Sequence, residues 1–438
     1  MISRRALLLL CVLACTALTS YGETGKNPAA APTSALAPYL GFGAESRGGS
    51  DGRVLMVTRL DDRLNDPPEG TLRWAISQRG PRIVKFAVCG DIELKNMIWI
   101  REPYLTIDGS DAPGNGVCIR YGSLMFGYTH DIIVRYVRIR LGKEAAERQR
   151  RYQGGPRPLH TTGLECVALN SCHHVLFDHC SLSWSCKEIF DINHSQAVTI
   201  QWCILSEPLA GPTLHPYGDD HACIINASAG TLSVHHCLME HFTFRGPQFE
   251  CNDMLPQDHF AVKMEALNNV IADFEQTGSR YSVGVETGSG VDGKTFRFQF
   301  LNNLYLKDHR RTPPVQALTN HGVTEDVRVC VAGNIERYPR KRLGPIPWPP
   351  SFSKDAEDER AVKPPYWQPA DEGLNLGSKL VEEPLFTTTA TEHLEPVEKA
   401  AAEVLAEAGC SLHRDEYDQR MVEDVRLRRF GRVLRPGS

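Results

Sequence analysis

The sequence predicts an all-β protein in which short strands coil into a parallel β-helix, a solenoid of stacked turns of chain. Three observations lead to this prediction. Short apolar stretches recur along the middle of the chain, their apolar residues alternate with a period of two, and one position in each stretch is small or can form hydrogen bonds. Patterning with the period of an α-helix is weak over the same span.

Each repeat is a brief strand with apolar positions two apart, followed by a small or polar pair and another apolar step. The spacing between repeats varies from 23 residues (175 to 198) to 43 residues (132 to 175), so loops of different length leave the stack at one side. The stretches are IIVRYVRI (132–139), VLFDHCSL (175–182), VTIQWCIL (198–205), LSVHHCLM (232–239), MEALNNVI (264–271) and FQFLNNLY (298–305), and their sixth residues are Val137, Cys180, Cys203, Cys237, Asn269 and Asn303.

A small or hydrogen-bonding residue at one point of every unit suits a stack of coils. Equivalent bends then lie over one another, and side-chain amides can bond along the stack. A β-sandwich is the competing architecture, with turns every 8–12 residues or so. The longer period and the column of cysteines and asparagines favour the β-helix.

Flanking segments complete the predicted architecture. The segment 70–94 contains a short amphipathic helix that would cap the open end of the stack, and 344–369 is rich in proline and predicts a long surface excursion. The tail contains a helix that ends at a glycine. We therefore expect a β-helix over residues 23–394 and a helical tail over 395–438.

The first 22 residues, MISRRALLLLCVLACTALTSYG, place two arginines before an apolar run. This layout is typical of a secretory signal and is too short for a spanning helix. We expect residues 1–22 to be a signal peptide and the mature protein to be secreted or periplasmic. A buried first helix is the alternative, although its cationic flank would then have no role. VLAC (12–15) also matches a bacterial lipoprotein cleavage box, which would anchor the chain through Cys15.

Composition narrows the function classes. The chain has 438 residues, a net charge of −5 and 23% charged residues, so nothing indicates binding to nucleic acid or to a membrane surface. Its 14 cysteines would suggest disulfides in an exported protein, but many occupy core-like positions of the repeat, where a free cysteine packs as a small hydrophobe. The histidine-rich span 173–241 has no tight His-x-x-x-His or Cys-x-x-Cys pair, so the sequence does not predict zinc.

Six stretches of the chain resemble, in order, the signature stretches of the pectate lyase superfamily, polysaccharide lyase family 1. The tail LAEAGCSLHRDEYDQRMVEDV is similar to the C-terminal segment of many bacterial members, and the resemblance covers roughly residues 36–310 and 398–425. The six stretches are GTLRWAISQRGPRIVKF, GDIELKNMIWIREPYLTIDGSDAPGNGV, DIIVRYVRIRLG, FDHCSLSW, VTIQWCILSE and SVHHCLMEH.

The resemblance implies a right-handed parallel β-helix that cleaves α-1,4-linked polygalacturonate, an acidic polysaccharide, by β-elimination. In this family an arginine removes the C5 proton, and calcium bridges the substrate carboxylate and acidic side chains. A proton next to a carboxylate is weakly acidic, so cations must neutralise the developing charge. An arginine can act as a base only where other positive charge and desolvation lower its pKa. We expect the protein to be a monomer.

The family's base lies in an Arg-x-Pro-x-x-Arg pattern after the His-His strand, which here becomes FRGPQFE (244–250). Arg245 matches the base position. The second arginine of the pattern is replaced by Glu250, and a further common arginine is Gln248. Both changes remove positive charge and would raise the proton affinity of Arg245. The alternative is that Arg245 is a structural or substrate-binding cation.

The resemblance also assigns metal and substrate positions. Glu165 and Asp191 match two of the four usual calcium ligands, whereas the other two positions are Gly163 and Lys187. Calcium takes six to eight oxygen ligands, so two carboxylates would hold it weakly. Lys187 could replace the metal between Glu165 and Asp191, as a basic side chain does in the pectin lyase branch. The plainer alternative is an ordinary surface ion-pair cluster.

Two further substrate positions lie in SEPLAGPTLHPYGDDH (206–221). His215 matches the family, and Tyr217 stands where the family has a lysine. A tyrosine can stack on a sugar ring but cannot pair with a uronate, so a less acidic or modified substrate is one hypothesis. His179, Asp178, His235 and His236 are expected to be structural.

Two rival functions remain at this stage. The protein could be a non-catalytic β-helix that binds acidic glycans, because several charged positions have changed. GDDH (218–221) could also indicate a polygalacturonase-like hydrolase, although the other motifs of that family are absent.

Overall fold

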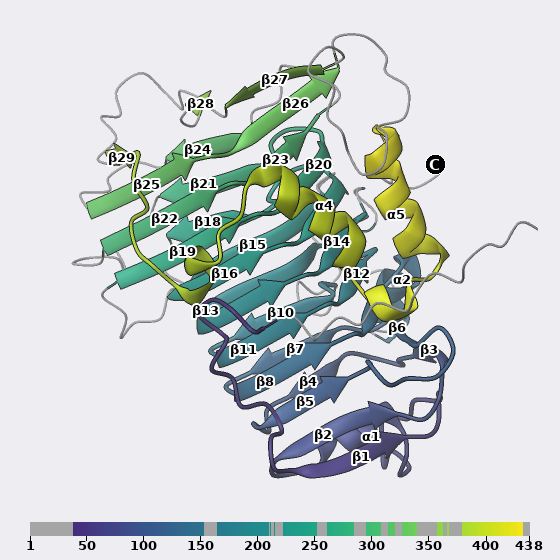
Figure 1. The fold of residues 1–438 in the computed structure, drawn as a ribbon. Coiled ribbons are helices and arrows are strands. Elements are labelled where there is room, and N and C mark those ends of the chain that lie inside the picture. Colours follow the sequence, from purple (N-terminus) through teal and green to yellow (C-terminus); the bar gives the residue numbers. More distant parts are fainter. Residues whose placement is uncertain are drawn as a thin grey trace, which may run out of the picture. The chain divides into compact units, whose positions relative to one another are not determined.

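The computed structural model describes residues 38–152, 164–209, 211, 214, 222–251, 261–283, 295–307, 314–319, 326–339, 357–361, 366–367 and 379–431. Residues Tyr39–Ser438 form one compact unit. Its strands stack in parallel ladders from β1 to β25 (Figure 1), which confirms the predicted all-β parallel β-helix. The predicted signal segment 1–22 and Cys15 lie outside the described residues.

The first ladder, ladder A, contains the first four positions of all six recurring stretches. Its strands pair in parallel without a shift of register from one coil to the next, so equivalent residues lie above one another. The strands are β1 (Arg53–Val57), β2 (Arg82–Phe86), β5 (Leu105–Asp108), β8 (His130–Arg135), β11 (His173–Asp178), the end of β13 (Glu188–Gln201), β16 (Thr231–His235), β19 (Ala261–Leu267), β22 (Thr295–Leu301), β25 (Asp326–Ala332) and β29 (Lys379–Val381).

From β8 (His130–Arg135) onward, ladder B follows ladder A in each coil after a two-residue turn. Its pairings are parallel except for the last, between β26 and β27. The strands are β3 (Gly90–Glu93), β6 (Val117–Arg120), β9 (Arg138–Arg140), β12 (Ser181–Ser183), β14 (Ile204–Ser206), β17 (Leu238–Phe242), β20 (Val270–Phe274), β23 (Leu304–Leu306), β26 (Ile335–Pro339) and β27 (Glu357–Ala361).

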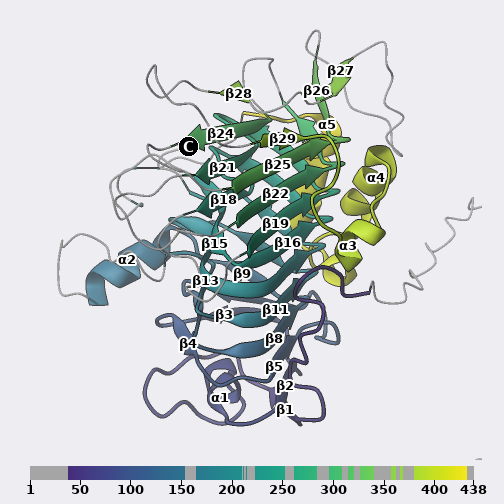
Figure 2. The ribbon, with the colours of Figure 1, turned by 90° about the vertical axis from the view of Figure 1, so that its left-hand side faces the viewer.

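Ladder C closes each coil, and β13 is long enough to serve ladder C with its first half and ladder A with its second. The helix α2 (Lys143–Tyr152) projects from the stack beside ladder C (Figure 2). The strands are β4 (Ile98–Ile100), β7 (Leu124–Gly127), β10 (Val167–Asn170), the start of β13, β15 (Cys223–Ala229), β18 (Gln248–Cys251), β21 (Ser279–Val283), β24 (Val315–Thr319) and β28 (Tyr366–Trp367).

The turns between ladders A and B explain the repeated pair of residues. The sixth residue of each stretch points inward, and from the middle of the stack onward it forms a ladder of amides. Asn269 Nδ2 donates to Asn303 Oδ1 at 2.9 Å, and Asn303 Nδ2 donates to Asn334 Oδ1 at 2.9 Å. Asn269 Oδ1 accepts from the backbone nitrogen of Cys237 at 2.9 Å. The predicted bonding along the stack is confirmed, and Asn334 extends it by one coil.

The fifth residue of each stretch has a left-handed backbone, with φ between 51° and 52°. Its side chain lies outside the turn, where rings of successive coils stack. Tyr136 and His179 have ring centroids 4.8 Å apart, His179 and Trp202 are 5.9 Å apart, and Trp202 and His236 are 4.4 Å apart. The column continues with Asn268 and Asn302, which tolerate this backbone conformation well.

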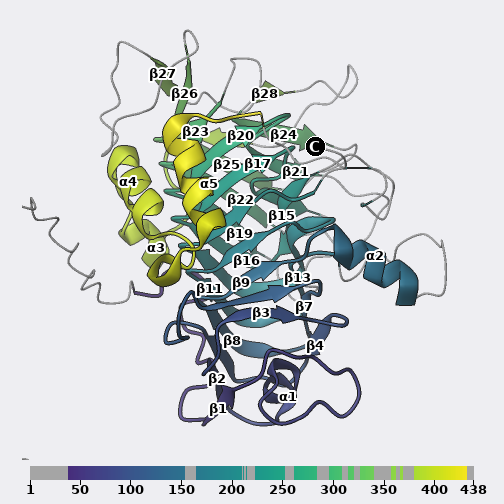
Figure 3. The same cartoon turned by 90° about the vertical axis from the view of Figure 1, so that its right-hand side faces the viewer.

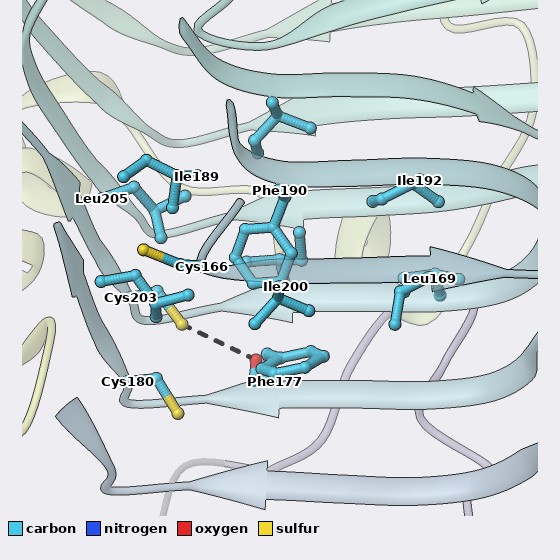
Figure 4. Packing of buried hydrophobic residues seen from close by; sticks show 14 of the residues in the cluster. Cys166, Leu169, Phe177, Cys180, Ile189, Phe190, Ile192, Ile200, Cys203 and Leu205 are labelled. Carbon is cyan, nitrogen blue, oxygen red and sulfur yellow. Dashed lines mark hydrogen bonds between the residues drawn. The ribbon is translucent and has the colours of Figure 1, made fainter. Parts of the chain in front are cut away.

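The core fills the space between the three ladders. Figure 4 shows aromatic and aliphatic side chains packed with cysteines, among them Phe177, Phe190 and Cys203. The Cys203 thiol lies 3.9 Å from the carbonyl oxygen of Phe177. Fully burying a large apolar side chain contributes about 1.5–3 kcal/mol. The cysteines of this core are free thiols, as expected for residues that pack as small hydrophobes.

Helices cover one end and one side of the stack. The predicted cap is α1 (Leu72–Ser77), where the Thr71 hydroxyl accepts from the Trp74 nitrogen and Leu72 and Ile76 are buried. The C-terminal helices α4 (Val397–Glu407) and α5 (Glu416–Leu427) lie over ladder B (Figure 3) and pack on outward residues such as Leu238 and Val270. The 3₁₀-helix η1 (Ser411–His413) lies between them in the sequence, and α3 (Thr389–Glu392) packs on Leu267 and Leu301 of ladder A.

The helix α2 (Lys143–Tyr152) was not predicted from the sequence, because it is polar and lies in a connection between two coils. Of the predicted excursion 344–369, the structure describes only β27 and β28. No helix of the described residues is long and apolar enough to cross a membrane.

Candidate functional site

Of the predicted site residues that the structure describes, Asp191 lies in ladder C, and Glu165, Lys187 and Arg245 lie just before strands of this ladder. The register aligns one residue from each successive coil, so that residues far apart in sequence become lateral neighbours. This row runs through Ala168, Asp191, Asn226, Gln248, Arg280 and Gln316.

Lys187 occupies the centre of a carboxylate cluster at the start of β13. Its Nζ donates to Glu165 Oε1 and to Asp191 Oδ2, both at 2.9 Å, and lies 3.3 Å from Glu188 Oε2. The side chain of Lys187 is only 13% exposed. The structure thus brings together the three predicted residues and adds Glu188. Glu188 went unnoticed in the sequence because the calcium assignment used only the residues on either side of it.

The electrostatics of this cluster hold Lys187 in its charged form. Burial opposes the ammonium charge, but the carboxylates of Glu165, Glu188 and Asp191 outweigh it and raise the pKa of Lys187. Burial also raises the pKa of Glu165 and Asp191. Burial acts in the same sense on Glu188, yet the charges of Lys187 and Arg245 lower its pKa overall. Glu188 is therefore the carboxylate most firmly ionised.

Arg245 lies just before β18 and is joined to this cluster. Its guanidinium donates to Glu188 Oε1 at 2.7 Å and lies over the Phe244 ring, 5.2 Å from the centroid. Burial lowers the pKa of Arg245, but Cys223, Glu188, Glu250 and Asp191 raise it, and the net shift is upward. Burial keeps the Cys223 thiol neutral by raising its pKa to about 12, so the carboxylates are the relevant cause.

Arg280, in β21, is a second arginine that the sequence analysis missed. Its guanidinium carbon lies 4.7 Å from the centroid of the same Phe244 ring. Among the described residues it forms no ion pair with a carboxylate, and its buried Nε has no hydrogen-bond partner. Burial and the charge of Arg245 lower the pKa of Arg280 to about 10. Arg280 is thus a cation available to an incoming anion.

The position of Arg280 offsets the charge lost at Gln248. The two residues are direct register partners in β18 and β21. Gln248 donates to Glu250, which also accepts from the Ser228 hydroxyl at 3.4 Å. The positive charge missing from the Arg-x-Pro-x-x-Arg pattern is therefore supplied one coil further along. The sequence does indicate that residues 248 and 280 are neighbours. The repeats at this point of the chain begin 32 residues apart, at 232 and 264, and residue 280 likewise follows residue 248 by 32 positions.

Calcium does not fit the residues that surround Lys187. Oxygen atoms of Glu165, Glu188 and Asp191 lie within 4.8 Å of one another, a grouping that could hold a metal ion. The ammonium of Lys187, however, lies among these oxygens and takes the place that calcium would occupy. A divalent cation beside a buried ammonium would be repelled. The donor set is that of an internal ion-pair network.

The arrangement presents a buried anionic cluster beside two arginines on an outer face. It can bind a carboxylate through Arg280 and stabilise negative charge next to Arg245. The remaining predicted substrate residues, His215 and Tyr217, lie outside the described residues. His179 and Asp178 are structural as expected, because Asp178 Oδ1 accepts from His179 Nδ1 and Gln201 Nε2, both at 2.8 Å.

Comparison with curated proteins finds fungal relatives. A probable pectate lyase C of Aspergillus flavus is 39% identical over 181 residues, which is 40% of this chain and 38% of the relative. A probable pectate lyase C of Aspergillus fumigatus is 36% identical over 170 residues, 39% of this chain and 36% of the relative. The chain therefore spans less than two fifths of the length of these relatives. No family model matches the chain.

Solved structures show the same fold. A thermostable pectate lyase superposes with a TM-score of 0.54 at 14% identity, covering 86% of this chain and 98% of that one. Jun a 1, the major allergen of cedar pollen, gives a TM-score of 0.52 at 16% identity, covering 84% and 92%. These comparisons confirm the resemblance to pectate lyases and the parallel β-helix.

Proposed function

We propose that this protein is a polysaccharide lyase that cleaves a uronic-acid polymer of the polygalacturonate type by β-elimination. The observation that carries the proposal is the pair of guanidiniums of Arg245 and Arg280 at one ring, Phe244, beside the buried Lys187 cluster. The sequence similarity to proteins named pectate lyase supports the same reaction class.

In the proposed reaction, Arg280 pairs with the carboxylate of the uronate whose C5 proton is removed. Neutralising this carboxylate makes the C5 proton more acidic. Arg245 accepts the proton in its neutral form, the C5–H electron pair forms a C4–C5 double bond, and the C4–O glycosidic bond breaks. The departing oxygen takes a proton from solvent, so the products are an unsaturated uronate end and a new reducing end.

The ion pair with Glu188 sets a condition on this role of Arg245. While the pair is closed, the carboxylate raises the proton affinity of Arg245 and opposes its action as a base. We propose that the 2.7 Å contact lengthens when substrate binds. Arg245 is assigned as the base from its match to the family pattern, and Arg280 as the substrate-binding cation from its charge and lack of a carboxylate partner among the described residues.

We propose that Lys187 takes the place of a protein-bound calcium ion. Glu165 and Asp191 then serve as partners of the ammonium and not as metal ligands. His215 and Tyr217 remain predicted substrate residues, and export and a monomeric state remain predictions.

An absorbance assay tests the reaction class. Polygalacturonate and pectin are incubated with the full chain, and the ultraviolet absorbance of a 4,5-unsaturated product is followed alongside the release of reducing ends. A lyase produces both signals, and the Arg245→Lys variant should lose both while still binding substrate. Reducing ends without absorbance would indicate a hydrolase, and binding without either signal would indicate a glycan-binding protein.

A chelator tests the role of Lys187 in the same assay. We expect EDTA to leave the rate within about twofold of that in buffer. A rate that collapses with EDTA and returns with calcium would overturn the proposal that Lys187 replaces the metal.

A further inference from the structure

A second group of potential metal ligands lies away from ladder C, where the C-terminal segment crosses the turns between ladders A and B. His236, the last ring of the stacked column, is followed in the next coils by Asn268 and Asn302. Both amides donate to the backbone oxygen of Glu395 at 2.8 Å, and Asn268 Oδ1 accepts from the Glu395 nitrogen at 2.9 Å. These three bonds fix Glu395 beside His236.

The side chains of His236, Glu395 and Glu403 converge at this place. One ligand atom from each, an imidazole nitrogen and two carboxylate oxygens, lies within 4.8 Å of the others. His236 Nε2 is 3.7 Å from Glu395 Oε2, which is beyond hydrogen-bond distance. That oxygen is buried and has no hydrogen-bond partner in the described structure.

His236 is well prepared to act as a ligand. The residue is 5% exposed, its ring stacks on Trp202, and its Nδ1 lies 3.0 Å from Nδ1 of His235. Where that nitrogen is the donor of the pair, the lone pair of Nε2 points toward the two carboxylates.

The two carboxylates lie close together, and in the described part of the chain the lysine that pairs with both of them is exposed. Lys399 contacts Glu395 Oε1 and lies 3.6 Å from Glu403 Oε1, but its side chain is 59% exposed. It can therefore move into water without leaving a buried charge behind.

We propose that His236, Glu395 and Glu403 form a binding site for a first-row divalent cation, with zinc as the best match. Imidazole nitrogens and carboxylate oxygens are both zinc ligands, and a zinc ion with three protein ligands keeps a fourth position for water. Metal–ligand distances of about 2.0–2.2 Å require the ligands to draw together by roughly 1 Å. Glu403, whose side chain is 39% exposed, has room to make this movement.

The site would fasten α4 to the coil that carries His236. The charge of the ion would balance the two carboxylates and release Lys399 to solvent. This inference does not rest on the proposed lyase function, because none of its residues lies on ladder C.

Zinc titration of the untagged full chain, stripped of metal by a chelator, tests the site. Calorimetry should show one zinc ion bound per chain, and zinc should raise the thermal unfolding midpoint as expected for a ligand that binds only the folded state. Glu403→Gln should weaken the affinity at least 10-fold. Lys399→Gln should strengthen it several-fold, because a competing cation is removed.

Glu407→Gln is the matched control, since Glu407 lies one turn further along α4 and outside the ligand group; its zinc affinity should equal that of the parent. His236→Gln should abolish binding. If that variant fails to fold, the site is tested by the opposite effects of Glu403→Gln and Lys399→Gln on the zinc affinity. The proposal would be overturned if the chain bound no zinc at micromolar concentrations. It would also be overturned if Glu403→Gln and Lys399→Gln both left the zinc affinity unchanged.

Discussion

Lys187 and Lys399 both lie among carboxylates, but they differ in their contact with water. Lys187 is 13% exposed and contacts three carboxylates, whereas Lys399 is 59% exposed and contacts two. A buried ammonium cannot leave without exposing uncompensated negative charge to a medium of low dielectric constant. An exposed ammonium can leave at little cost, because water solvates it equally well.

This difference decides which group of carboxylates can take a metal ion. The ladder C cluster resembles a metal site in its oxygen atoms, but its counter-ion is built into the chain. The cluster at His236 has a replaceable counter-ion and an imidazole nitrogen among its potential ligands. The same two residue types therefore produce an internal ion-pair network at one place and a candidate metal site at another.

The largest expected effect comes from removing the buried lysine. Lys187→Ala should lower the free energy of unfolding by about 3–5 kcal/mol, because Glu165, Glu188 and Asp191 are left uncompensated. Urea unfolding measures this loss. Calcium should then restore part of the stability of the variant, while leaving the parent unchanged. A loss below about 1 kcal/mol would show that the cluster behaves like a surface ion pair.

The next largest effect is expected at Arg280, which has no carboxylate partner among the described residues. Arg280→Gln should lower kcat/KM on polygalacturonate roughly 10- to 100-fold, because a charge-assisted hydrogen bond contributes about 1.5–3 kcal/mol. In the parent, the affinity for polygalacturonate should fall as the pH rises above about 10, where Arg280 loses its proton. Steady-state kinetics of the variant and substrate binding by the parent across this pH range check the two expectations, and an Arg280→Gln variant with parental kcat/KM would remove Arg280 from the site.

Glu188 links the buried ammonium to the proposed base, and its removal tests that link. Glu188→Gln removes a charge that raises the pKa of Arg245, so the limb of the pH–rate profile that rises with Arg245 deprotonation should move to lower pH. The pH profile of kcat/KM measures this shift. Glu250→Gln is the control, because the carboxylate of Glu250 lies further from Arg245 and its removal should shift the profile less. A limb that moves to higher pH would contradict the role of Arg245 as the base.

The smallest effect is expected at the exposed lysine. Lys399→Ala should leave the urea unfolding midpoint unchanged in metal-free buffer, because solvent replaces its contacts. A midpoint that falls as far as that of Lys187→Ala would erase the distinction between the two lysines.

The fold could be predicted from local sequence, whereas the site could be predicted only in part. The alternation of apolar residues and the column at Cys180 and Asn269 reflect contacts between equivalent positions, which any repeat displays in its sequence. Asn334 shows the same signal in VCVAGNIE (329–336) but was not aligned. The α2 helix was missed because a polar helix in a connection leaves no apolar stripe.

The missed site residues depend on lateral neighbours. Arg280 lies beside Gln248 only because the coils stack in register, and a motif read along the chain ends before reaching it. The ligands at His236 come from segments more than 150 residues apart (236 to 395) that meet through hydrogen bonds of Asn268 and Asn302. No spacing rule along the sequence could indicate this contact.

The asparagine ladder has a consequence for how the stack opens. From Asn269 to Asn334, each turn is tied to the next by a side-chain amide bond, whereas the coils of Cys180 and Cys203 have thiols in the same place. Local opening of the stack should therefore begin in the coils that contain Cys180 and Cys203, and it should not extend past Asn269. We expect backbone amides near Cys203 to exchange with deuterium sooner than those near Asn303, and the cysteine thiols to react with alkylating agents at the same rate as that local opening.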